Sequence, residues 1–187
     1  RITGATTPAT AGHSFVAPMT PRTGARADGW ATRLRFRCTN APAAQSFEPV
    51  NVALLSMNPN PAPDIIPIAV TPSNDQVIRL PGASGSGFMA AAAVNIGAAA
   101  TLTVRPRVVG NTTAVVSICR TTNGTCINPP AAFVSHAFQP NAASTFTIFA
   151  TAQGAIPFDP AAKRVMLDFV DAGGVIRGQT SAAIMTQ

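Results

Sequence analysis

The segment Arg164-Val-Met-Leu-Asp-Phe-Val-Asp-Ala-Gly-Gly-Val-Ile-Arg-Gly-Gln-Thr-Ser-Ala-Ala-Ile-Met-Thr186 decides the fold class. It holds two apolar runs of strand length, which meet at Asp171-Ala-Gly-Gly174, a composition typical of a hairpin turn. The whole chain contains 17 Pro and 14 Gly, which leave few uninterrupted windows for a helix. The sequence therefore predicts an all-β protein built as an antiparallel β-sandwich.

Further segments of strand length recur at the spacing expected of a sandwich. In the second half of the chain we predict strands at residues 101–108, 113–120, 132–138, 144–151, 164–170 and 175–185. Earlier candidates are residues 33–38, 50–57, 65–70 and 76–80. Because proline cannot donate a ladder hydrogen bond, Pro67 predicts an edge strand or a bend in the third of these.

Residues 88–96 carry two competing signals. The run Ala90-Ala-Ala-Ala93 favours a helix by intrinsic propensity. However, Phe88, Val94 and Ile96 fall on one face at a period of two, and Gly97 ends the run. We predict a strand here.

The domain organisation is predicted from composition and from one internal similarity. Residues 1–29 are rich in Thr, Ala, Pro and Gly, which is typical of an arm or linker. The segments around Cys38 and Cys119 each continue into a proline-containing loop and another apolar run. This similarity predicts two small sandwiches in tandem: a β-rich domain or half-sandwich over 30–97, and a sandwich over 98–187. One sandwich with an N-terminal extension is the alternative.

The region 88–186 resembles immunoglobulin-like β-sandwich modules of bacterial secreted and surface proteins. The similar elements are Ser117-Ile-Cys119 through Cys126 with Pro129-Pro130, then Thr145-Phe-Thr-Ile-Phe149, and Asp168-Phe-Val-Asp-Ala-Gly-Gly with Arg177-Gly-Gln-Thr-Ser181. The resemblance implies a role in spacing, adhesion or assembly, and it carries over no catalytic residue. The core tryptophan and inter-sheet disulfide of antibody domains are not matched, because the single tryptophan is Trp30.

Two of the three cysteines, Cys119 and Cys126, are candidates for a disulfide. A two-residue turn at Asn123-Gly124 would place Thr121 opposite Cys126, so the bond needs a longer loop, a bulge or a diagonal contact. Cys38 is left single. The chain begins at Arg1 without a methionine, which favours either removal of a signal peptide or pro-segment or a sequence that is part of a longer chain. We therefore expect an extracellular, cell-surface or periplasmic location.

The net charge of +6 includes a cluster of five arginines within sixteen residues: Arg22, Arg26, Arg33, Arg35 and Arg37. Guanidinium groups pair bidentately with carboxylate, sulfate and phosphate, so the cluster is a candidate site for an anionic polymer such as a polysaccharide. The simpler interpretation is an arginine-rich strand face that keeps a sheet edge soluble.

No motif of catalysis or cofactor binding stands out, so we expect no cofactor, no catalytic residue and no metal ligand set. Asp159, Asp168 and Asp171 could converge on Ca²⁺, although Lys163 or Arg164 could instead balance Asp168. His136 is expected to be a half-exposed structural residue. Nucleic acid is not an expected partner, since the chain offers no recognition helix and Phe36 would point opposite the arginines on its strand, which leaves no aromatic platform beside them.

The sequence favours a non-catalytic extracellular subunit of a surface layer, filament or other complex. Its partners would be copies of itself or other extracellular subunits, joined by strand edges and by an arm with apolar anchors at Ile2, Phe15, Val16 and Met19. The alternative is a monomeric module whose Arg33, Arg35 and Arg37 hold an anionic polymer. A Ca²⁺-dependent or hydrolytic enzyme is the third possibility.

Overall fold

The computed structural model describes residues 30–33, 35, 40, 42–43, 53–55 and 60–187. Two short strands, β1 (Trp30–Thr32) and β2 (Ala53–Leu55), form an antiparallel pair. The remaining strands are β3 (Ile65–Val70), β4 (Val77–Leu80), β5 (Ser86–Asn95), β6 (Ala100–Val109), β7 (Ala114–Thr122), β8 (Thr125–Cys126), β9 (Val134–Phe138), β10 (Ala143–Ala152), β11 (Arg164–Val170) and β12 (Ile176–Thr186). The all-β prediction is confirmed.

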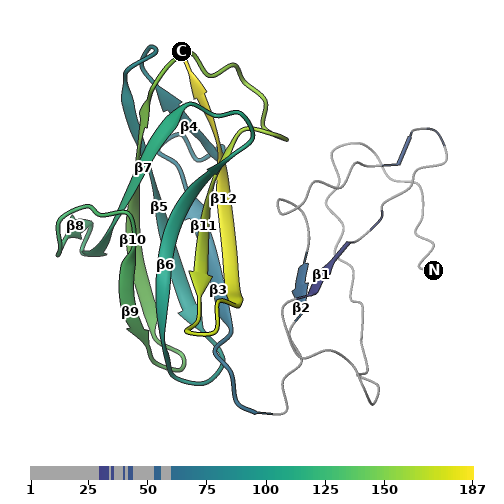
Figure 1. Cartoon of the computed structure of the whole chain (residues 1–187), viewed down its shortest axis with the longest axis vertical. Coiled ribbons are helices and arrows are strands. Elements are labelled where there is room, and N and C mark those ends of the chain that lie inside the picture. Colours follow the sequence, from purple (N-terminus) through teal and green to yellow (C-terminus); the bar gives the residue numbers. More distant parts are fainter. Residues whose placement is uncertain (1–29, 34, 36–39, 41, 44–52, 56–59) are drawn as a thin grey trace.

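The strands β3 to β12 form one sandwich of two five-stranded sheets (Figure 1). Sheet I has the order β3-β5-β10-β7-β8, and sheet II has the order β4-β12-β11-β6-β9. All pairs are antiparallel except β12 with β4. With β3, β5, β10 and β7 as strands A, B, E and D, and β6, β11 and β12 as C, F and G, this is the strand order of an immunoglobulin-like sandwich.

The core lies between the two sheets and alternates with outward residues along each strand. Its centre is an aromatic cluster of Phe138, Phe146 and Phe169, with ring centroids 5.8–6.2 Å apart. Phe146 belongs to sheet I, whereas Phe138 and Phe169 belong to sheet II. Each of the three rings is at most 1% exposed, so the cluster ties the two sheets together.

The prediction of two tandem sandwiches divided near Gly97 is wrong. Strands on both sides of that residue share both sheets, since β5 pairs with β10 and β4 pairs with β12. The buried side chain of Asn95 holds the β5–β6 connection: its Oδ1 accepts from the Asp64 and Gly97 N–H groups, and its Nδ2 donates to the Ala98 carbonyl. A Cβ at Gly97 would lie 2.3 Å from the Ala62 carbonyl oxygen. The connection is a packed turn and not a linker.

The strand at 88–96 is confirmed as β5, in spite of its alanine run. Ala91 and Ala93 are buried in the core, and Ala90 and Ala92 are exposed on the other face. Pairing with β3 on one side and β10 on the other overrides the helical propensity of alanine. The edge position predicted from Pro67 is also confirmed, because β3 is the outermost strand of sheet I.

The hairpin predicted at Asp171-Ala-Gly-Gly174 joins β11 to β12. Asp171 Oδ1 accepts hydrogen bonds from the N–H groups of Gly173 and Val175, each at 2.9 Å. Gly174 has a φ of +81°, which a residue with a side chain rarely adopts. The carboxylate of Asp171 therefore organises the turn.

Candidate functional site

The five clustered arginines and the apolar arm lie mostly outside the described residues. This holds for Arg22, Arg26 and Arg37, and for the anchors Ile2, Phe15, Val16 and Met19. Arg33 and Arg35 are described, exposed and outside any regular strand, directly after β1. The predicted strand over 33–38 is therefore absent at the two positions where it can be checked.

The structure joins Cys119 and Cys126 by a disulfide, with 5.6 Å between their Cα atoms. Asn123 and Gly124 both have positive φ and form a two-residue turn, which sets Thr121 opposite Cys126. Cys119 lies two residues away on the same face, so the bond is the diagonal one among the arrangements that the sequence allowed. Cys38 lies outside the described residues.

The outer face of sheet II carries an ionic network that the sequence analysis did not single out. The arginines at its outward register positions are Arg79, Arg105, Arg107 and Arg164, and Arg177 lies at the bulge that follows the β11–β12 turn. Arg107 Nε lies 2.7 Å from Asp168 Oδ2, and Arg177 Nε lies 2.6 Å from Asp171 Oδ2. Arg79 pairs with Asp75 at 2.6 Å. Because each of these acids has an arginine partner, the network braces the sheet.

Asp168 is fully buried in this network, and its expected partners were wrong. It accepts hydrogen bonds from Arg107 and from the side-chain amide of Gln179, not from Lys163 or Arg164. Arg164 instead donates to Ser181 and to the Pro160 carbonyl, and burial lowers its pKa. Nor do the aspartates converge: the described residues contain no group of three His, Cys, Asp or Glu suited to a metal ion.

The outer face of sheet I, which we call the uncharged face, differs from that of sheet II in its side chains. The outward positions of β3, β5, β10 and β7 carry only apolar, Ala, Ser, Thr and Cys side chains, without one charged residue. Five large apolar side chains there are 44–62% exposed: Ile66, Ile68, Val70, Phe88 and Val115. Contiguous exposed apolar patches of this kind are typical of interaction surfaces.

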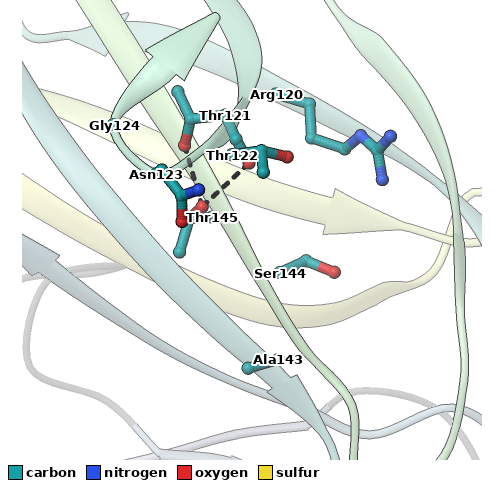
Figure 2. Close-up of a pocket in the computed structure, with 8 residues that line it drawn as sticks. All are labelled: Arg120, Thr121, Thr122, Asn123, Gly124, Ala143, Ser144 and Thr145. Carbon is teal, nitrogen blue, oxygen red and sulfur yellow. Dashed lines mark hydrogen bonds between the residues drawn. The ribbon is translucent and has the colours of Figure 1, made fainter. Parts of the chain in front are cut away.

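Two hollows open where the uncharged face meets the β7–β8 turn. One, of about 240 Å³, is lined largely by Ala and Thr side chains of β5 and β10, with Val70 and Gly124 beside them. The other, of about 460 Å³, lies around the turn itself (Figure 2). Thr121 Oγ1 donates to Thr145 Oγ1 at 2.8 Å, and Thr145 Oγ1 donates to the Thr121 carbonyl. These bonds occupy the hydroxyls of Thr121 and Thr145.

A third hollow, which we call the edge hollow, opens along β9. It has a volume of about 670 Å³ and is lined by β9 itself, by Ile127, Asn128 and Phe133, and by Arg120 of β7. His136 Nε2 lies 2.7 Å from Ser144 Oγ, and its ring contacts Phe138 at a centroid distance of 4.6 Å. Burial, together with the positive charge of Arg120, lowers the pKa of His136.

The Ser144–His136 pair resembles the nucleophile and base of a hydrolase only in distance. Such a pair needs a third group that orients the base. Within residues 60–187, no carboxylate hydrogen-bonds to His136, and a cation rather than an acid is its charged neighbour. The partly buried His136 fits the structural role expected from the sequence.

Comparison with known proteins adds little. No protein-family model and no curated protein matches the chain. Among solved structures, WR4, a member of the C. elegans MSP family, matches with a TM-score of 0.34 and 8% sequence identity, over 67% of this chain and 97% of that one. The fold assignment rests on the strand order. The described part of the chain has no helix that is long and apolar enough to cross a membrane.

Proposed function

We propose that this protein is a non-catalytic extracellular subunit that assembles with copies of itself, and that the uncharged face is the surface through which copies meet. The observation that carries the proposal is the contrast between the two outer faces of the sandwich. One presents Ile66, Ile68, Val70 and Phe88 without a charge, and the other presents exposed arginines such as Arg79 and Arg105. Burial of the apolar side chains would supply the driving force.

Electrostatics favours this face for contact between identical chains. The chain has thirteen Lys and Arg against seven Asp and Glu, so two copies repel each other overall. A contact through the arginine-bearing face would bring guanidinium groups together. A contact through the uncharged face brings no like charges into the interface, and a two-fold axis would let the same patch serve both copies.

The disulfide supports the extracellular part of the proposal. Cys119 and Cys126 close a short loop at the end of sheet I. Structural disulfides persist in oxidising compartments and are rare in the cytosol. The location that fits is therefore the cell surface, the extracellular space or the periplasm.

Replacement of Ile68 by Glu is expected to dissociate the assembly. Ile68 is 62% exposed, so the monomer should remain folded, whereas an unpaired carboxylate in an apolar interface is costly. We expect self-association about 100-fold weaker or more, measured by sedimentation equilibrium. Phe158→Glu is the matched control, because Phe158 is 56% exposed in the loop between β10 and β11. Equal association of both variants would exclude the uncharged face.

Deletion of residues 1–25 is expected to prevent ordered assemblies while the sandwich stays folded. In the proposal, the anchors Ile2, Phe15, Val16 and Met19 lie on a strand edge of a neighbouring copy. Among the described residues, the sandwich begins with β3 at Ile65, which is well outside the deleted segment. Electron microscopy would follow assembly, and circular dichroism would follow folding. Unchanged assemblies after the deletion would rule out the arm as a connector.

A further inference from the structure

The strand β9 is an open edge of sheet II. It pairs with β6 on one side, and no backbone hydrogen bond joins it to another described segment on the other side. Its sequence, Val134-Ser-His-Ala-Phe138, contains no charged residue and no proline. Proteins usually block exposed edges with lysine, proline, bulges or covering loops. This edge carries no such block within the strand, so it can accept a further strand.

The edge hollow lies directly beside this strand. Val134, Ser135, His136 and Ala137 line it from β9, so it follows the strand along most of its length. The side chains of Phe133 and Ile127, which are 57% and 47% exposed, stand at its border. A strand added to β9 would therefore place alternate side chains into the hollow.

Arg120 supplies the charge of the hollow. It lies opposite Phe146 in the register, so its side chain is on the inter-sheet side of β7. Figure 2 shows this side chain extending away from the Thr121–Thr145 pair. The backbone of Arg120 is fixed by two hydrogen bonds: its N–H donates to Asn128 Oδ1, and its carbonyl accepts from the Ile127 N–H. Unlike Arg107 and Arg177, Arg120 has no carboxylate partner in residues 60–187.

The groups around Arg120 leave it as the dominant charge. His136 and Ser144 are hydrogen-bonded to each other. The lowered pKa of His136 keeps its ring neutral at neutral pH. The other described residues that line the hollow are apolar, Ser or Asn. A planar guanidinium in such a setting is suited to bidentate binding of a carboxylate.

We propose that β9 and the edge hollow bind an extended segment of another polypeptide, which adds to the β9 edge and places an Asp or Glu side chain against Arg120. The main chain of the segment would bond to β9, and the carboxylate would select the sequence. This surface is separate from the uncharged face, so the inference does not depend on self-assembly.

Charge favours a different polypeptide over a second copy as the occupant. The chain has only seven acidic residues, and Asp75, Asp168 and Asp171 are already in ion pairs. Its net charge of +6 would steer an acidic partner toward it.

The test is a selection of displayed random heptapeptides on the full chain, in parallel with Arg120→Gln and Arg105→Gln. Arg105 is an exposed arginine on the outer face of sheet II, away from the edge hollow, which makes it a matched control. The wild type and Arg105→Gln should enrich Asp or Glu at one position, and Arg120→Gln should not. The selected peptide should bind Arg120→Gln about 10- to 100-fold more weakly.

A second measurement locates the peptide and shows that each variant is folded. Amide hydrogen exchange should slow in β9 when the selected peptide binds, with the exchange of the core strands unchanged between the variants. No acidic enrichment, enrichment that survives Arg120→Gln, or protection on β3 instead of β9 would each overturn the proposal.

Discussion

A fragment that begins at Ala98 is expected not to fold. It lacks β3, β4 and β5, and β5 is an inner strand of sheet I that pairs with β10 from Ala143↔Val94 to Thr151↔Ser86. Its loss would leave one edge of β10 open and expose core residues such as Ile148 to water. Since domains are only marginally stable, losing three strands should remove all of the folding free energy.

The matched fragment is residues 60–187, which contains every strand of the sandwich. We expect it to show a strand-type circular dichroism spectrum and one cooperative unfolding transition in urea, and we expect the shorter fragment to show neither. A cooperative transition in the 98–187 fragment would restore the tandem architecture that the sequence alone suggested.

Replacement of Asp171 by Ala is expected to lower the free energy of unfolding by about 3 kcal/mol. The variant loses the acceptor for the N–H groups of Gly173 and Val175 in the hairpin. It also removes the carboxylate 2.6 Å from Arg177, whose side chain is only 7% exposed. Asp171→Asn keeps an oxygen for the two N–H groups but removes the charge, so its loss should be intermediate. Urea unfolding at pH 7 measures the free energy of unfolding of both variants against the wild type.

The pH dependence of the free energy of unfolding tests the same interactions of the Asp171 carboxylate. Burial opposes ionisation of Asp171, but hydrogen bonds from Val175, Arg177 and Gly173 outweigh it and lower the pKa of the carboxyl below its usual 3.8. The contribution of the Asp171 carboxylate to the free energy of unfolding is therefore present at pH values above the pKa of Asp171 in the unfolded chain. It is lost as the pH falls through the pKa of Asp171 in the folded protein. The wild type should lose more stability than Asp171→Asn on going from pH 5 to pH 2. Parallel losses would contradict the role of the charge.

Local sequence signals accounted for most of the strands and turns. The period-two pattern of β3, β5 and β10 and the Asn123-Gly124 turn act over a few residues, so they can be recognised directly. Such local signals could not decide between the predicted pair of sandwiches and the alternative of one sandwich. The boundary inferred near Gly97 failed because Asn95 bonds to Asp64 and Ala98, and such contacts depend on the folded arrangement.

The candidate sites also differ in how far the sequence could predict them. The uncharged face follows from alternation, since Ile66, Ile68 and Val70 point outward together once β3 is known to be a strand. The position of Arg120 beside β9 does not follow from alternation, because Arg120 and β9 belong to different sheets and meet only when the two sheets pack together. The density of arginines in the sequence drew attention to residues 22–37. The ion pair between Arg107 and Asp168 was missed, because it forms diagonally between the paired strands β6 and β11, where Arg105 is the register partner of Asp168.

The most direct test of self-assembly is the mass of the native, tag-free protein in solution, measured by light scattering over a range of concentrations. Self-assembly through the uncharged face predicts a mass that is a multiple of 19.1 kDa and that falls to the monomer value on Ile68→Glu. A monomer of 19.1 kDa at every concentration would contradict it. That result would favour a monomeric module that binds an anionic polymer through arginines such as Arg33 and Arg35.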